Sequence, residues 1–159
     1  MTEDARFEDG AERPLRLVAQ TADDVPVISA LVQDAVFPAS EMTWDRGARR
    51  FALLLNRFRW EDRARAERQG RAYERVQSLL VVGDVLSVAS SGVDRRDDAL
   101  VVSLLSVTFT PGADGSGEVL LTMAGDGAIR LTVECIDLAL RDVTRPYRAP
   151  SGKAPGHDI

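Results

Sequence analysis

The sequence contains one cysteine, one histidine and one lysine among its 159 residues. Because Cys135 is the only cysteine, the chain forms no internal disulfide and no zinc cage built on CxxC pairs. Because His157 is the only histidine and lies in a polar tail, a Ser/His/Asp or Cys/His pair within an ordered site is nearly excluded. We therefore predict no catalytic residue, no metal site and no cofactor, and an enzyme is the less favoured class.

The chain also lacks an apolar run of the roughly eighteen residues that a membrane helix needs. Residues 1–9 are acidic and lack the apolar centre of a signal peptide. The net charge of −5 argues weakly against general affinity for nucleic acids or membranes. The expected protein is soluble, reduced and cytoplasmic, with no membrane partner.

A chain of this length fits one domain, and 45% hydrophobic with 28% charged residues is ordinary for a globular protein. We expect a single globular domain over residues 14–147. The polar segments 1–13 and 149–159 are predicted to be disordered tails.

Segment 49–60 carries the clearest pattern and is predicted to be the central strand. Its apolar residues alternate between two faces, with Phe51, Leu53 and Leu55 on one and Ala52, Leu54, Phe58 and Trp60 on the other. A strand that is apolar on both faces belongs in the middle of a layered domain, covered above and below.

The remaining patterns predict one helix and several more strands. Residues 24–36 have apolar side chains at helical spacing, and Pro38 is expected to end that helix. Residues 61–74 lack an apolar stripe and are predicted to form an exposed loop or a frayed helix. The residues 83–84 and 125–127 are predicted hairpin turns. The other predicted strands are 15–19, 41–44, 75–82, 85–91, 100–109, 118–123 and 128–133.

Segment 134–143 fits two structures. Its apolar residues have helical spacing, yet Ile136, Leu138 and Leu140 also alternate as they would in a strand, and we favour a short helix. The predicted fold class is α+β, with a curved, mostly antiparallel sheet of about 7–8 strands, the N-terminal helix 24–36 and a short C-terminal helix. This arrangement is compatible with a PH-like barrel.

Several segments together resemble a small domain family of uncharacterised function from alphaproteobacteria. The segments that carry the resemblance are 33–36, 50–61, 129–134 and 140–142. The resemblance covers nearly the whole ordered chain and implies a bacterial protein. It implies no activity, so function is argued from the residues alone.

The isolated cysteine and the paired carboxylates are interpreted as structural. We predict that Cys135 is a small buried side chain rather than a nucleophile. Asp23 and Asp24 are predicted to cap a helix, and the acidic pairs 61–62 and 97–98 to be solvated turns.

Segment 46–75 has an unusual charge: ten arginines against four acids give it a net +6, which leaves −11 for the rest of the chain. Arginines interleaved with exposed aromatic residues are typical of proteins that hold single-stranded nucleic acid. The candidate nucleic-acid contacts are Arg63, Arg65, Arg68, Arg71 and Tyr73.

A simpler interpretation of the same segment is favoured. In it, Phe51, Phe58 and Trp60 face the core, while Arg57 and Arg59 cover a sheet face with their aliphatic stems. A third interpretation is an acidic protein partner or self-association.

Asn56 is the one polar residue that stands out on the central strand. It is expected to be a buried amide that satisfies a neighbouring strand or loop. If that strand borders a cleft, Asn56, Arg57, Arg59 and Trp60 form a ligand-binding cluster.

Three function classes remain after these arguments. We favour a non-enzymatic cytoplasmic binding or protein-interaction domain with an unknown protein partner or as a homodimer. The alternatives are RNA binding through segment 46–75 and an enzyme that acts on a small anionic metabolite.

Overall fold

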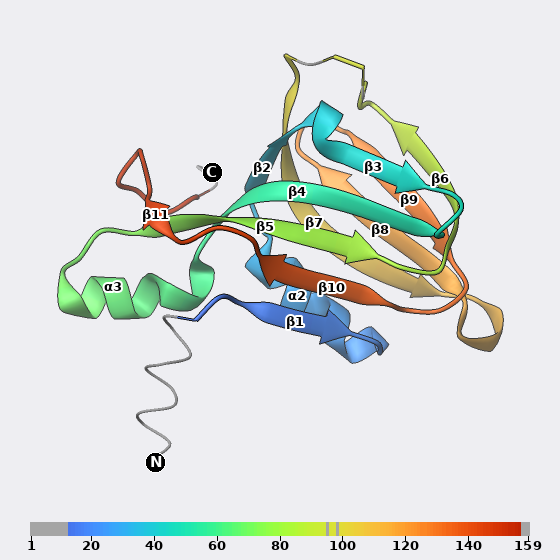
Figure 1. Cartoon of the computed structure of the whole chain (residues 1–159), viewed down its shortest axis with the longest axis horizontal. Helices are drawn as coiled ribbons and strands as arrows, with labels where there is room; N and C mark the ends of the chain where they lie inside the picture. The colour runs from blue at the N-terminus through green and yellow to red at the C-terminus, as the bar shows by residue number, and fades with distance from the viewer. Residues whose placement is uncertain (1–12, 95, 98, 157–159) are drawn as a thin grey trace, which may run out of the picture.

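The structure is a computed structural model that describes residues 13–94, 96–97 and 99–156 (Figure 1). The predicted disorder of residues 1–12 and 157–159 therefore concerns segments outside the described residues, as does Asp98 of the pair 97–98. Within the expected C-terminal tail, Ala149 is buried and its N–H donates to the Tyr73 carbonyl at 2.8 Å.

The described strands form one open, curved, antiparallel sheet of eleven strands. Its order is β1-β10-β5-β4-β2-β7-β8-β9-β6, with β11 paired to β5 and β3 paired to β4 beside this path. The strands are β1 (Arg16–Ala19), β2 (Ala35–Pro38), β3 (Met42–Asp45), β4 (Arg50–Phe58), β5 (Glu74–Val82), β6 (Val85–Ser91), β7 (Val101–Pro111), β8 (Gly117–Met123), β9 (Ala128–Val133), β10 (Leu138–Asp142) and β11 (Tyr147–Arg148).

Helical structure is limited to short segments. Two α-helices and four single 3₁₀ turns are described: η1 (Ala22–Asp24), α2 (Val25–Leu31), η2 (Ala39–Glu41), η3 (Trp60–Asp62), α3 (Arg63–Gln69) and η4 (Ala113–Gly115). No helix of the described residues is long and apolar enough to cross a membrane.

Curvature brings the two halves of the sheet face to face around one core. In Figure 1, β1, β10, β5 and β4 lie in front of β7, β8 and β9, and α2 lies behind β1 and β10. One buried cluster joins residues of both halves, including Leu53, Leu80, Leu121 and Leu131, with Ile28 from α2. The Ser29 hydroxyl accepts a hydrogen bond from the Val107 N–H at 2.9 Å, which ties α2 to β7.

The predicted central strand is confirmed as β4, which lies between β5 and β2 within the sheet. Phe51, Leu53 and Leu55 are buried, as the alternation requires. We predicted that other elements cover β4 on both faces of the sheet, but only its inner face is covered. Ala52 and Leu54 on the outer face stay partly exposed.

The predicted helix 24–36 is wrong in its second half. Val25, Ile28 and Val32 face the core at helical spacing, but α2 ends at Leu31. Asp34 then takes a left-handed conformation with φ of 62° and its N–H donates to the Leu104 carbonyl at 2.8 Å. The chain continues as β2, because residues 35–38 pair with β7. Pro38 therefore ends a strand and not a helix.

The predicted hairpin at 83–84 is also wrong. A turn does form there, with Asp84 at φ of 54°, but β5 pairs with β4 and β10 whereas β6 pairs with β9. The chain crosses at this corner from one half of the sheet to the other. Two backbone bonds hold the corner, from the Val85 N–H to the Arg49 carbonyl at 2.8 Å and from the Glu134 N–H to the Asp84 carbonyl at 2.9 Å. The hairpin at 125–127 is confirmed by the β8–β9 pairing.

The C-terminal segment is a strand and not the short helix that we favoured. Leu138 and Leu140 of β10 point into the core, and β10 inserts between β1 and β5. The apolar residues of segment 134–143 also have helical spacing, which favoured the wrong prediction. The structure of so short a segment is decided by its pairing with β1 and β5 on its two sides. Short strands such as β2, β10 and β11 raise the total from the predicted 7–8 to eleven within the described residues.

Segment 61–74, predicted as a loop or frayed helix, contains α3. Ala66 is its one buried residue, which explains the lack of an apolar stripe. Gly70 ends α3 in a left-handed conformation with φ of 63°, a conformation that glycine adopts at little cost.

The burial predicted for Cys135 is contradicted, since this residue is exposed. Its thiol lies 3.1 Å from Asp84 Oδ2, to which it donates a hydrogen bond. This hydrogen bond, partial burial and the charges of Asp84, Asp137 and Glu134 together raise the pKa of the thiol.

We expect Asp84→Asn to speed alkylation of Cys135 by iodoacetamide at neutral pH. The thiolate is the reactive form, and the substitution removes the carboxylate that most disfavours it. Asparagine also tolerates the left-handed conformation of residue 84. Alkylation followed by mass spectrometry measures the rate, and an unchanged or slower rate would contradict the proposed role of Asp84.

Candidate functional site

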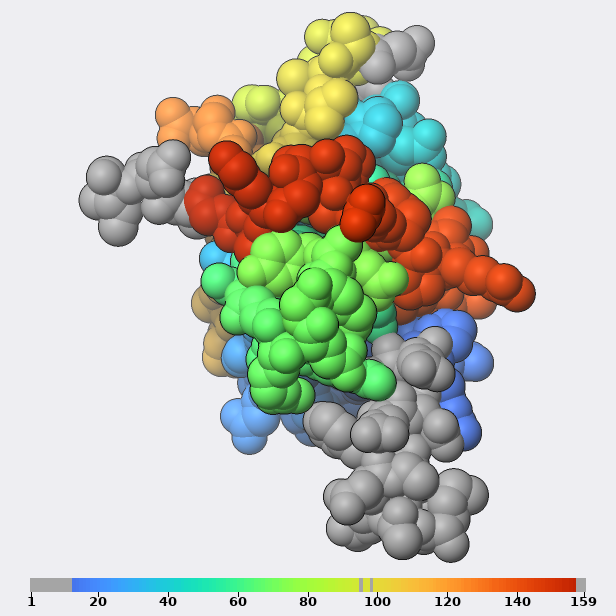
Figure 2. All heavy atoms as spheres, turned by 90° about the vertical axis from the view of Figure 1, so that its left-hand side faces the viewer, coloured from blue at the N-terminus to red at the C-terminus, as the bar shows by residue number. Residues whose placement is uncertain are grey.

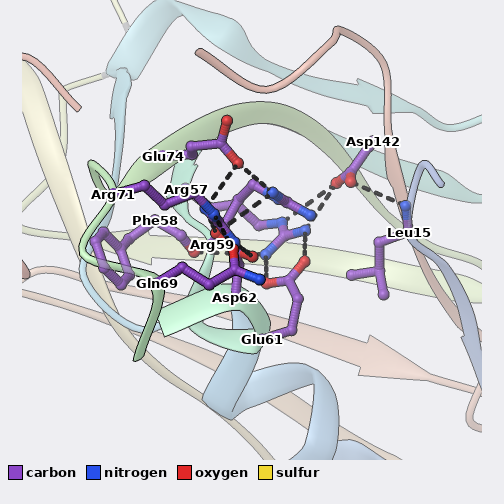
Figure 3. Close-up of polar contacts among 10 residues, drawn as sticks. All are labelled: Leu15, Arg57, Phe58, Arg59, Glu61, Asp62, Gln69, Arg71, Glu74 and Asp142. Atoms are coloured by element: carbon purple, nitrogen blue, oxygen red, sulfur yellow. Dashed lines mark hydrogen bonds and ion pairs between the residues drawn. The ribbon is translucent and has the colours of Figure 1, made fainter. Parts of the chain in front are cut away.

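Arg57 lies on the central strand β4, and its charged guanidinium is completely buried. Its Nη1 and Nη2 atoms donate to the two Glu61 carboxylate oxygens, each at 2.8 Å. Nη2 also reaches Asp142 Oδ1 at 2.9 Å, and Nε donates to Ser78 Oγ at 2.9 Å. Figure 3 shows this guanidinium between Glu61 and Asp142. Arg57 thus joins β4 to β5, β10 and η3.

Asp142 extends the same network to the edge of the sheet. Its Oδ2 accepts the Leu15 N–H at 2.9 Å, just before β1, and its Oδ1 accepts the Ser78 hydroxyl at 2.7 Å. Burial of Arg57 opposes its charge, but the hydrogen bonds and charges of Glu61 and Asp142 outweigh that effect and raise its pKa. The guanidinium is therefore a permanent buried cation whose partners are fixed.

A second network surrounds Asp62, whose side chain is only 3% exposed. This contradicts the prediction of a solvated turn for Asp62, whereas Glu61 is exposed. Arg71 donates to both carboxylate oxygens of Asp62, at 2.6 and 2.8 Å, and Arg59 lies 3.7 Å away. Arg59 also pairs with Glu74 (Figure 3). Burial opposes ionisation of Asp62, but the Arg71 hydrogen bonds and the charges of Arg59, Arg71 and Arg65 outweigh it and lower the pKa of Asp62.

These side chains form one wall of a cavity of about 560 Å³ that we call the α3 pocket. It is lined by Arg59, Asp62, Arg65, Arg71, Glu74 and Arg145, among others. Figure 2 looks onto this side of the molecule, where α3 (green) lies beside the segment that follows β10 (red). Four guanidinium groups therefore meet two carboxylates around one cavity.

The four arginines of the α3 pocket divide into two kinds. Arg59 and Arg71 are held by Asp62 and Glu74. Within the part of the chain that the structure describes, Arg65 and Arg145 form no ion pair. Among the described residues that line it, the α3 pocket therefore has two guanidinium groups more than carboxylates.

The predicted ligand-binding cluster is not brought together in one pocket. Arg59 lines the α3 pocket, whereas Arg57 is buried behind it. The Asn56 amide bonds to the Tyr147 hydroxyl and accepts from Arg75 Nε at 2.6 Å. Trp60 Nε1 donates to the Gln33 carbonyl at 3.0 Å. The Asn56 amide is thus satisfied by β5 and β11, as expected, although it is only partly buried. Of the simpler interpretation, the burial of Phe51 and Phe58 is confirmed, but Trp60 is only partly buried and Arg57 is buried as far as its guanidinium.

The candidate nucleic-acid contacts lie on or near α3 but differ in their surroundings. Arg65 and Arg71 line the α3 pocket, while Arg63 pairs with Glu67 at 3.2 Å and lies 5.8 Å from the centre of the Trp60 ring. The Tyr73 hydroxyl donates to Glu67 at 2.7 Å, and its ring packs on Phe58. Arg68 is exposed in the last turn of α3.

Sequence reasoning missed Arg145, Asp62, Glu74 and Asp142. Arg145 and Asp142 lie far along the chain from α3, so no local pattern connects them to it. The signal that was available is the sequence Glu61-Asp62, where a 3₁₀ turn directs one carboxylate toward Arg57 and the other toward Arg71.

Comparison with known proteins gives a family but no activity. A model of the family described as protein of unknown function (DUF2948) matches residues 15–157. No curated protein and no solved structure matches the chain. Among the described residues, no group of three or more His, Cys, Asp or Glu side chains could hold a metal ion.

We expect Arg57→Met to lower the free energy of unfolding by about 3–5 kcal/mol, because it leaves the buried Asp142 carboxylate without its cation. Arg130→Met is the matched control, since Arg130 pairs with Glu118 on the exposed surface and should contribute about 1 kcal/mol or less. Urea unfolding followed by tryptophan fluorescence measures both. Equal effects of the two substitutions would show that the Arg57 network is not a major source of stability.

The lowered pKa of Asp62 predicts a pH-dependent contribution to stability. The ionised carboxylate stabilises the fold above its unfolded pKa of about 3.9, and this contribution disappears as the pH falls through the lower folded value. Asp62→Asn should therefore cost about 2 kcal/mol from pH 8 to about 5, and progressively less below about pH 4. Asp126→Asn in the β8–β9 turn is the control. A cost that does not change with pH would contradict this assignment.

Proposed function

The chain belongs to the family of unknown function that matches residues 15–157, and we propose that it is a non-enzymatic binding domain that holds an anionic group in the α3 pocket. The shared chemistry of the bound group is a carboxylate or a phosphate, either free or carried by a protein partner. The excess of guanidinium groups around one cavity is the observation that carries this proposal.

The α3 pocket has the size and the charge that such a group requires. A volume of about 560 Å³ falls within the range of roughly 300–1,000 Å³ that is typical of small-molecule sites. Arginine presents its donors in a planar fork that matches both oxygens of a carboxylate or phosphate. Arg59 and Arg71 are already fixed by Asp62 and Glu74, so they line the site at little cost in side-chain entropy.

The same geometry favours binding over acid–base catalysis. A general acid or base works best when its pKa lies near the operating pH. The buried acid of the α3 pocket, Asp62, has its pKa lowered and both of its oxygens occupied by Arg71. An enzyme acting on an anionic metabolite would have to use other residues for proton transfer.

RNA binding remains the second hypothesis for the arginine-rich segment. Its exposed arginines, such as Arg68 on α3, favour contact with phosphates along a surface. The aromatic side chains favour anion binding in the α3 pocket over RNA binding. The Tyr73 ring packs on Phe58, and Trp60 donates a hydrogen bond to the Gln33 carbonyl. Stacking of bases needs free aromatic faces.

We expect the full chain to bind inorganic phosphate or citrate in isothermal titration calorimetry, and Arg65→Ala or Arg145→Ala to weaken binding about tenfold each. The double variant should bind neither anion detectably. A titration with a short peptide of aspartate and glutamate tests whether the anionic group is better presented by a protein. Absence of binding by all three probes would overturn the proposal.

Arg68→Ala separates the α3 pocket from the helix surface. Arg68 lies on α3 but does not line the pocket, so this variant should keep its affinity for phosphate and citrate. A mixed-sequence RNA oligomer, titrated in rising salt, is the parallel probe. Tight RNA binding that Arg68→Ala weakens as much as Arg65→Ala does would favour the nucleic-acid function over the pocket.

A further inference from the structure

The outer face of the half-sheet β1-β10-β5-β4 carries a row of apolar side chains. Val18, Ala139, Val81 and Ala52 lie opposite one another across these four strands. Their sequence neighbours Leu53, Leu80 and Leu140 point inward and are buried, so this row points outward. It forms the floor of a hollow of about 520 Å³. Val18 is 57% exposed, which is unusual for a large apolar residue on a strand.

The two ends of this outer face carry opposite charges. At one end Arg16 and Arg141 lie directly opposite each other on β1 and β10, an arrangement that repels. Neither arginine forms an ion pair within the described part of the chain. At the other end of the hollow lie Asp84 and Asp137.

Arg50 shares the acidic end, but Asp45 lies directly opposite it on β3. Asp137 is placed on the outer face by its contact with Gly83, where an added Cβ would come within 2.6 Å of Asp137 Oδ2. The acidic end therefore keeps its negative charge next to the hollow.

The charges are arranged symmetrically along one strand. Asp137 and Arg141 each lie two residues from Ala139, which is in the centre, and all three line the hollow. Suppose that two copies pack with their outer faces together. A two-fold axis that lies in the plane of contact, perpendicular to β10 and above Ala139, then makes β10 of the second copy run in the opposite direction. It places Arg141 of each copy over Asp137 of its partner and packs the two apolar rows together.

We propose that the outer face is a self-association surface, which pairs two copies of this chain through the Arg141 and Asp137 side chains around Ala139. The surface is complementary to itself in charge and apolar at its centre, as an isologous interface requires. Binding relieves the repulsion between Arg16 and Arg141 by bringing the Asp137 carboxylate of the second copy over Arg141. The α3 pocket is a separate site, because it shares no lining residue with this hollow.

The size of the outer face predicts a weak dimer. Four strands at about 4.8 Å spacing and about five residues at 3.3 Å each give an area on the order of 300–400 Å² per copy. An area of this size is typical of transient interfaces. The dissociation constant should therefore lie in the micromolar range, and it should rise with salt because salt screens the charge pairs.

Charge exchange tests the proposal in analytical ultracentrifugation over a micromolar concentration series. Arg141→Asp should raise the dissociation constant at least about tenfold, because it opposes two pairs of carboxylates. Asp137→Arg should do the same by opposing arginines. The double variant with both substitutions restores opposite charges across the axis and should restore the dimer.

Further variants separate this interface from other contacts. Val81→Asp places a charge in the apolar row and should abolish association, whereas Arg68→Glu on α3 should leave it unchanged. Circular dichroism confirms that each variant is folded. A monomer at all concentrations, or a dimer that the double variant fails to restore, would overturn the proposal.

Discussion

The structure depends on one buried cation. The Arg57 guanidinium lies in a region from which water is excluded, and it is satisfied by carboxylates that come from η3 and β10 and by a hydroxyl from β5. A charge in such a place is tolerated only when its partners are present, so the network couples the formation of β4 to that of β5 and β10 and to the placement of Leu15, just before β1. Correct pairing of β4, β5 and β10 therefore brings Ser78 and Asp142 to Arg57.

The α3 pocket follows from the same constraint. Glu61 and Asp62 are adjacent in a 3₁₀ turn, and the turn commits Glu61 to the buried Arg57 and Asp62 to Arg71. Arg59, which directly follows β4, pairs with Glu74. Arg59 and Arg71, two of the four arginines that line the pocket, are therefore positioned by carboxylates next to the buried network of Arg57, which gives this part of the pocket wall the rigidity of the sheet.

Parts of this arrangement could be predicted from the sequence, and the reasons for success and failure are physical. The alternation of Phe51, Leu53 and Leu55 predicted a buried strand correctly, because an apolar face that repeats every second residue is stable only when it packs against the core. The burial of Arg57 and Asp62 could not be predicted, since charged residues are rarely buried without partners and the Arg57 partner Asp142 lies 85 residues away. The strand at 138–142 was missed for the same reason: its structure is set by β1 and β5.

The place of β10 has a consequence for how the chain reaches this fold during synthesis. β10 follows β1 and β5 in the chain but lies between them in the sheet, so neither β1 nor the outer edge of β5 has this partner until residue 142 has left the ribosome. Until then the nascent chain presents an open, apolar strand edge, which other chains can pair with. Assembly of this half of the sheet therefore waits for β10, and a product that terminates before residue 138 would be a candidate for aggregation and proteolytic removal.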